Sequence, residues 1–479
     1  MPGWFVEVHY ISLYSGIMGK TMYLMTAAMI LMAVACSSPD IQEHTGPLKI
    51  SENGRFFTDQ NGEPFFWLGD TGWLLFGKLD REAAVRYLED RRQKGFNVIQ
   101  VMLLHDPGMT SVYGDSALVN RNVARPKVTG GSSFEENEEY DYWDHVDFII
   151  DRADEKGICM ALVPVWGSHV RSGHVSRKAI RAYGEFLAER YNHRKNIIWL
   201  NGGDVRGSDS TAIWSILGHT LKERCPDHLI TFHPFGRTQS STWFHNDPWL
   251  DFNMFQSGHK RYDQDTSGLA YGEDNWRYAG EDYGLYPVKP TLDGEPSYEG
   301  IPQGLHDPSQ PFWTDKDVRR YAYWSVFAGS AGHTYGHSAI MQMHRPGDEN
   351  PGYGNTVYWT DALDAPGAGQ LIHLKNLMLS RPYFERIPDQ SLIADQGERY
   401  DYLSATRSTG YAFVYTYTGR NFTVDPGPLA GTELHASWFN PRDGSTTGIG
   451  TFPNRGLLEF DPPGERGEGN DWVLILDAL

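Results

Sequence analysis

Between residues 48 and 381 the chain has eight short apolar segments, six of which are followed by a longer amphipathic segment. The expected strands cover residues 64–70, 97–104, 158–163, 196–200, 229–233, 252–256, 290–295 and 332–335. The expected helices cover residues 80–94, 142–156, 177–191, 211–224, 315–327 and 370–380. Strands that alternate with helices form parallel sheets, and eight such units close into a barrel. The sequence therefore predicts an α/β fold over residues 48–381, a (β/α)8 TIM barrel.

Local signals support this order and oppose the main alternative, an open doubly wound sheet. Asp80 is suited to cap the helix that follows it, and Gly95 is suited to end that helix. A hairpin of residues 49–51 and 55–57, turned by Asn53 and Gly54, is expected before the first barrel strand. No Gly-x-Gly-x-x-Gly pattern follows the first strand, as a doubly wound dinucleotide-binding sheet would require.

After residue 381 the pattern changes to short runs with a period of two. Expected strands lie at residues 402–406, 411–416, 435–439 and 472–476, and turns rich in Gly, Pro, Asn and Asp separate them. Such runs are typical of two packed antiparallel sheets. Residues 382–479 are therefore predicted to form a small C-terminal β-sandwich.

The amino-terminal segment indicates export. Residues 23–35 are apolar and uncharged, Lys20 precedes them, and small residues lead up to Cys36. This run fits the apolar core of a signal peptide and is shorter than the roughly 20 residues that span a bilayer. Residues 1–36 resemble a bacterial lipoprotein signal with Cys36 as the lipidation site, and residues 37–47 resemble a tether; a plain secretory signal is the alternative. We expect an exported monomer, lipid-anchored to the bacterial cell envelope, either in the periplasm or on the cell surface.

The charge balance excludes one class of partner. With 61 acidic and 42 basic residues the chain has a net charge of −19, and nucleic acid binding requires a basic face. The same charge opposes docking on anionic lipid, which leaves the lipid anchor as the expected membrane contact. Fifteen Trp, 26 Tyr and 23 Phe suit a cleft that stacks on sugar rings, although a large core would use them equally well.

Two acidic residues follow opposite strands of the predicted barrel. Asp204 ends the fourth strand segment and Glu295 the seventh. Chemistry in this fold occurs at the carboxyl ends of the strands, and strands four and seven lie nearly opposite each other. Paired carboxylates there can flank a glycosidic bond, about 5–5.5 Å apart for retention or about 6.5–9.5 Å apart for inversion. The alternative is that Asp204 caps a helix and Glu295 pairs with an arginine.

The other strand ends are polar and aromatic, as hydrogen bonding and stacking to a sugar would require. The residues predicted to bind substrate are Asp70, Trp73, His105, Trp166, His169, Asn201, His233, Gln256, His259 and Tyr335. A metal site is the rival interpretation of the histidines. No His-x-His or His-Glu-x-x-His spacing supports it, and no Gly-x-Ser-x-Gly or phosphate loop appears. We therefore expect neither a metal nor a cofactor.

Four stretches together are similar to a known family. Residues 65–73 (FFWLGDTGW), 94–100 (KGFNVIQ), 199–204 (WLNGGD) and 293–299 (DGEPSYE) resemble the apiosidase-like glycoside hydrolases of gut Bacteroidetes. The resemblance spans about residues 48–381. Residues 383–477 resemble the collagen-binding-type β domain that usually follows, for which a packing role is the expectation.

The resemblance implies a clan A barrel, a retaining mechanism and cleavage of apiose-linked side chains of rhamnogalacturonan II. Carried onto this chain, Asp204 matches the acid/base and Glu295 the nucleophile, with Glu299 as a rival nucleophile. Many clan A relatives have Asn-Glu where this chain has Gly203 and Asp204. The expected partner is a polysaccharide or oligosaccharide.

Three other functions remain open on the sequence. The chain could be a clan A hydrolase with a different glycan substrate, a non-catalytic surface glycan-binding lipoprotein, or an adhesin that acts through its tail. The retained acidic pair favours an enzyme, because a binding protein would not need it.

Overall fold

The computed structural model describes residues 46–136, 138–266 and 271–479. The predicted signal segment, Cys36 and nearly all of the tether lie outside these residues. Within the described ranges no helix is both long enough and apolar enough to cross a membrane.

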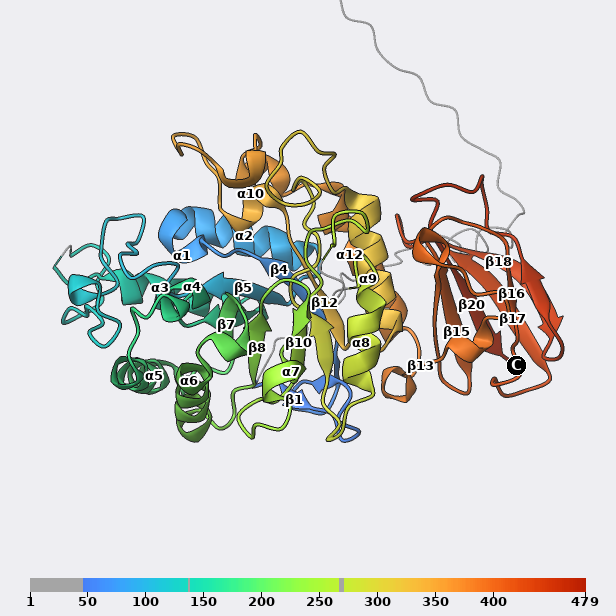
Figure 1. Cartoon of the computed structure of the whole chain (residues 1–479), viewed down its shortest axis with the longest axis horizontal. Helices are drawn as coiled ribbons and strands as arrows, with labels where there is room; N and C mark the ends of the chain where they lie inside the picture. The colour runs from blue at the N-terminus through green and yellow to red at the C-terminus, as the bar shows by residue number, and fades with distance from the viewer. Residues whose placement is uncertain (1–45, 137, 267–270) are drawn as a thin grey trace, which may run out of the picture. The chain divides into compact units, whose positions relative to one another are not determined.

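A parallel sheet closes around the centre of the larger domain (Figure 1). Its parallel strands are β4 (Trp67–Thr71), β5 (Val98–Met102), β6 (Cys159–Val163), β7 (Ile197–Val205), β8 (Ile230–Pro234), β10 (Asn253–Gln256), β11 (Thr291–Asp293) and β12 (Gly332–Tyr335). The order is β8-β7-β6-β5-β4-β12-β11-β10, with β9 (Thr238–Gln239) antiparallel at the end of the sheet. The sheet closes between β8 and β10, where the Asp251 amide donates to the Ile230 carbonyl at 2.8 Å. The predicted (β/α)8 TIM barrel is confirmed.

Helices surround this sheet, and the first of the longer ones begins at the cap expected from the sequence. The longer ones are α2 (Arg81–Gln93), α3 (Tyr142–Asp154), α5 (Arg177–Tyr191), α6 (Thr211–Arg224), α8 (Asn275–Tyr283), α9 (Asp315–Phe327) and α12 (Pro366–Leu379). The short ones are α1 (Leu75–Lys78), α4 (Gly167–Arg171), α7 (Ser241–Phe244), α10 (Ser338–Met341) and α11 (Trp359–Ala362). The Asp80 carboxylate accepts from the Ala83 amide at 2.8 Å, as expected of the cap of α2. Gly95 follows α2 with φ +81°, a left-handed conformation that suits glycine.

The expected hairpin is present before the barrel, and a third strand extends it. Strands β1 (Lys49–Ile50), β2 (Phe57–Thr58) and β3 (Pro64–Phe65) form a separate antiparallel sheet. Residues 64–70 are therefore not one barrel strand, because Pro64 and Phe65 pair with β2 and the barrel strand begins at Trp67. Helix α8 is absent from the sequence-based prediction.

The C-terminal domain is built from antiparallel strands, as predicted. One sheet has the order β13 (Ile387–Pro388), β14 (Leu403–Arg407), β15 (Tyr411–Thr416), β20 (Trp472–Ala478), β17 (Glu433–Phe439) and β18 (Thr446–Pro453). A second, two-stranded sheet pairs β16 (Phe422–Val424) with β19 (Leu458–Phe460).

The two faces of the larger C-terminal sheet have different partners, because successive side chains of a strand point to opposite faces. Along β15, Ala412 and Val414 pack into a core with the small sheet. Phe413 and Tyr415 instead join the hydrophobic core that continues into the barrel. The Tyr415 ring stacks on Tyr323 of α9 with ring centroids 4.7 Å apart. Strand β15 is thus buried on both faces, with the barrel helix α9 against one of them.

Candidate active site

A cavity of about 610 Å³ opens at the carboxyl ends of the barrel strands. Asp204, at the end of β7, and Glu295, just after β11, both line it. The structure therefore brings the two predicted catalytic carboxyl groups together in one pocket.

The end of β7 is bent so that Asp204 enters this pocket. Gly202, Gly203 and Asp204 all have positive φ, at +93°, +102° and +51°, and the pairing of β7 with β8 is interrupted there. A Cβ on Gly202 would lie 2.7 Å from the carbonyl oxygen of His233, and one on Gly203 would lie 2.7 Å from the Trp166 ring. Only glycine fits both positions without displacement. The Gly-Gly pair is thus the local reason that the strand can present Asp204 to the cavity.

The surroundings of Asp204 favour the protonated acid. Burial raises its pKa above the usual 3.8, and the negative charge of Glu295 raises it further. A general acid must hold its proton until the leaving group departs. Asp204 is therefore in the environment that this role requires.

Glu295 has the opposite environment, although it is also buried. His259 Nε2 lies 3.1 Å from its Oε1, in hydrogen-bonding geometry. His233 Nε2 lies 3.2 Å from its Oε2, off the line of a good hydrogen bond. Burial by itself raises the pKa of Glu295, but its contacts with the two imidazoles outweigh burial and hold the pKa below the usual 4.5. Glu295 is therefore kept as a carboxylate, the form that can act as a nucleophile.

Backbone amides orient both imidazoles. The Asp204 amide faces His233 Nδ1 at 3.3 Å, and the Tyr298 amide faces His259 Nδ1 at 3.4 Å. An amide can only donate, so Nδ1 of each ring accepts and the proton of a neutral ring is on Nε2. In that tautomer His259 Nε2–H donates to Glu295 Oε1, and the protonated Nε2 of His233 lies beside Oε2.

The predicted substrate-binding residues divide into two groups. Those that line the cavity are Trp73, His105, Trp166, Gln256 and His259. His233 lies behind Glu295 and is fully buried. Gln256 is buried, and its Oε1 has no hydrogen-bond partner among the described residues. A buried carbonyl oxygen without a partner is costly, so it is suited to a substrate hydroxyl group.

Like His233, the other four predicted substrate contacts do not line the cavity, and their polar groups are used within the protein. Asp70 pairs with buried Arg91 at 2.8 Å. The Asn201 side chain donates to the Trp214 carbonyl at 2.8 Å, and His169 Nε2 lies 3.0 Å from the His105 carbonyl.

Tyr335 is the fourth, and it explains the place of Glu299. The Tyr335 hydroxyl donates to Glu299 Oε2 at 2.7 Å, and the Gly367 amide at the start of α12 donates to the same oxygen at 3.0 Å. Glu299, the rival nucleophile, therefore anchors a helix and does not line the cavity.

Several lining residues were missed because they lie on loops without periodicity. They are Arg237, Lys260, Leu305, His306, Gln342 and Tyr353. The rings of His306 and Tyr353 stack with centroids 5.9 Å apart, which joins the loops that follow β11 and β12 beside the two carboxyl groups. The sequence does not predict that His306 and Tyr353 meet, because neither loop has the periodicity of a helix or a strand. Across the described part of the chain, no three His, Cys, Asp or Glu side chains cluster as metal ligands.

Comparison with known proteins assigns the larger domain. The model of the apiosidase-like catalytic domain matches residues 51–385. The chain belongs to this family. Residues 387–477 of this apiosidase-like protein match a domain described as the collagen-binding domain of a collagenase.

Solved structures agree with this assignment. The structure of a glycoside hydrolase is 48% identical over 90% of this chain and 97% of its own, with a TM-score of 0.85. A glycoside hydrolase family 5 protein from Bacteroides vulgatus is 44% identical over 90% and 94%, with a TM-score of 0.85. Another B. vulgatus glycoside hydrolase, 14% identical over 91% and 83% with a TM-score of 0.62, shares the fold. No curated protein sequence matches this chain. By family and fold the apiosidase-like protein is a glycoside hydrolase, and its substrate is a polysaccharide or oligosaccharide.

Proposed function

We propose that this protein is a retaining glycosidase in which Glu295 is the nucleophile and Asp204 the acid/base. The observation that carries the proposal is the contrast between two carboxyl groups in one cavity. Burial and a neighbouring negative charge raise the pKa of Asp204, whereas contacts with two histidines lower that of Glu295. Environments that separate two carboxyl pKa values in this way distinguish the group that donates a proton from the group that stays ionised.

In the first step a Glu295 oxygen forms a bond to the anomeric carbon while the glycosidic C–O bond breaks. The Asp204 proton passes to the departing oxygen. In the second step Asp204 takes a proton from water, whose oxygen bonds to the anomeric carbon and displaces Glu295. The sugar leaves with its original anomeric configuration, and both carboxyl groups return to their starting states.

We propose apiose-linked side chains of the pectin rhamnogalacturonan II as the substrate. The family description supports the apiose specificity. The acidic character of pectin is compatible with Lys260, which lines the cavity and has no acidic partner among the described residues. Trp73 and Trp166, with ring centroids 5.5 Å apart, give the cavity an aromatic wall on which a sugar can pack.

Product analysis with rhamnogalacturonan II side chains tests this function. We expect wild type to release an apiose-terminated product, Glu295→Gln to lose at least about 1,000-fold of the rate, and Asp204→Asn to lose about 100- to 10,000-fold. Glu299→Gln is the matched control, a nearby buried glutamate outside the cavity, and it should retain turnover. Full activity in Glu295→Gln, or an inverted anomer in the first product, would contradict the mechanism. Wild type that binds the glycan without cleaving it would instead favour the non-catalytic binding function, and cleavage of only other glycans would favour a different substrate.

We also propose that the protein is a monomer anchored to the cell envelope through Cys36. The support is the sequence of residues 20–36, which lies outside the described part of the structure. Labelled palmitate should enter wild type and be absent from Cys36→Ser, which should leave the membrane fraction. Labelling that persists in Cys36→Ser would contradict the anchor, and light scattering measures the oligomeric state.

A further inference from the structure

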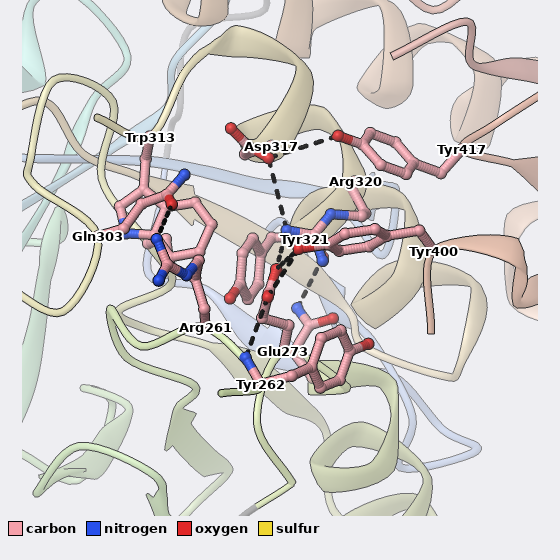
Figure 2. Close-up of polar contacts among 12 residues, drawn as sticks. Arg261, Tyr262, Glu273, Gln303, Trp313, Asp317, Arg320, Tyr321, Tyr400 and Tyr417 are labelled. Atoms are coloured by element: carbon pink, nitrogen blue, oxygen red, sulfur yellow. Dashed lines mark hydrogen bonds and ion pairs between the residues drawn. The ribbon is translucent and has the colours of Figure 1, made fainter. Parts of the chain in front are cut away.

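Glu273, just before α8, joins the barrel to the C-terminal domain (Figure 2). It is fully buried, and its carboxylate accepts from three different parts of the chain. The Tyr262 amide donates at 3.2 Å, Arg320 of α9 pairs at 2.6 Å, and the Tyr400 hydroxyl lies 2.9 and 3.1 Å from its two oxygens. Of these donors only Tyr400 comes from the C-terminal domain, where it lies in the 3-10 turn Arg399–Asp401.

Arg320 is held in a cage of aromatic rings from both domains. Its guanidinium lies 4.9 Å from the Tyr400 ring, 5.2 Å from the Tyr417 ring and 4.8 Å from the Tyr321 ring. Arg320 and Glu273 are both fully buried, so each charge offsets the cost of burying the other, and removal of either one would be destabilising. Arg320 holds the Glu273 carboxylate from the barrel, and the Tyr400 hydroxyl donates to the same carboxylate from the C-terminal domain.

The segment that Glu273 holds, residues 257–264, also carries His259. Only two residues separate His259 from Tyr262, whose amide donates to Glu273 and whose ring lies 5.7 Å from that of Tyr400. The His259 carbonyl accepts from the Gly304 amide at 2.7 Å, so the far side of the segment is fixed on the loop after β11. Arg261 strengthens this attachment through Gln303 at 3.0 Å. The contact of His259 with Glu295 thus depends on two attachments of this segment, one to Glu273 and one to the loop after β11.

We propose that the C-terminal domain is part of the active-site scaffold, in which Tyr400, through Glu273, is a positioning residue for His259. This inference takes one point from the proposed function, namely that Glu295 is the nucleophile. It gives the C-terminal domain a role within the enzyme, since its tyrosine holds the segment that orients a catalytic carboxylate.

The experiment compares Tyr400→Phe with Tyr417→Phe in the full-length protein. The two are matched, because each removes one hydroxyl and leaves a ring over Arg320. The Tyr417 hydroxyl, however, donates to Asp317 at 3.4 Å and not to Glu273. ¹⁵N NMR of the histidine rings at neutral pH, with His259 assigned through His259→Gln, reports the tautomer directly.

In wild type and Tyr417→Phe we expect a protonated Nε2 and an unprotonated Nδ1 on His259. In Tyr400→Phe the two signals should move toward their average, and amides of residues 258–264 should exchange with deuterium about tenfold faster or more. Glu273→Asp is the second variant, for use if Tyr400→Phe is unstable. It keeps the charge beside Arg320 but shortens the side chain, and it should change the His259 spectrum in the same direction. An unchanged His259 spectrum in Tyr400→Phe, or equal changes in Tyr400→Phe and Tyr417→Phe, would overturn the proposal. Neither readout needs turnover, so absence of hydrolysis by wild type would contradict the proposed function separately.

Discussion

The backbone amide of Asp204 donates to Nδ1 of His233 at 3.3 Å, and the opposite nitrogen of the same ring lies 3.2 Å from Glu295. One imidazole therefore connects the backbone of the proposed acid to the carboxylate of the proposed nucleophile. A movement of the end of β7 changes the environment of both groups, which makes their ionisation mutually dependent.

The pKa of Asp204 should fall when the charge of Glu295 is removed. Burial is the first cause of its raised pKa and the charge of Glu295 the second, and Glu295→Gln removes only the second. Carboxyl ¹³C NMR of wild type and Glu295→Gln, with Asp204 assigned through Asp204→Asn, measures the change. For kcat/KM of wild type we expect a bell-shaped pH profile, with its alkaline limit above the usual aspartate range. An identical Asp204 titration in both proteins would show that the two carboxyl groups do not interact.

Replacing Gly203 with alanine should damage both folding and catalysis. The residue has φ +102°, and a Cβ there would lie 2.7 Å from the Trp166 ring. We expect Gly203→Ala to lower the free energy of unfolding by about 1–3 kcal/mol, and to lower kcat about 100-fold because Asp204 is displaced. Gly280→Ala is the control: this exposed glycine lies within α8 with open space around it, and alanine there should stabilise by about 0.5–1 kcal/mol. Urea unfolding and kcat measure both, and unchanged kcat in folded Gly203→Ala would contradict the role of the bend.

Glu299 should make the protein less stable as the pH rises from 4.5 to 7. Burial raises its pKa from the usual 4.5 to about 7, so the folded state binds a proton more tightly than the unfolded state. Its contribution to stability is complete below pH 4.5 and is lost as the pH rises through 7. Between these limits wild type should lose on the order of 3 kcal/mol relative to Glu299→Gln. Urea unfolding of both proteins across this range tests it, and parallel pH dependences would rule it out.

The barrel could be predicted because its strands are apolar along their whole length and its helices carry capping signals. Asp204 and Glu295 could be placed at the cavity for the same reason, since each follows a strand. The strand split between Phe65 and Trp67 could not, because both halves have the same composition. Helix α8 was also not predicted, because Trp276, Tyr278 and Tyr283 are as typical of a strand as of a helix.

The walls of the cavity were predictable only where a strand ends in it. Lys260, His306 and Tyr353 lie on loops whose course depends on distant contacts, such as the Gly304 amide on the His259 carbonyl. The hydrogen-bond partner of a buried polar residue could not be predicted either. Tyr335 and Glu299 are 36 residues apart, and nothing in their spacing shows that their side chains meet.

Asp70 tests that last point, because the sequence places it with the substrate and the structure places it with Arg91. Both side chains are fully buried 2.8 Å apart, and the Tyr87 hydroxyl also donates to Asp70 at 2.7 Å. Asp70→Asn removes the closer of the two carboxylates beside the buried Arg91 charge, Asp90 lying 3.5 Å away, so it should lower the free energy of unfolding by about 3–5 kcal/mol while the folded fraction keeps its KM. Gln256→Ala should do the reverse, with little loss of stability and a KM raised roughly threefold to tenfold, because an unpaired Gln256 oxygen lines the cavity. Urea unfolding and steady-state kinetics on the same preparations separate the two effects. A raised KM with unchanged stability in Asp70→Asn would contradict this structural role and indicate that Asp70 contacts the substrate.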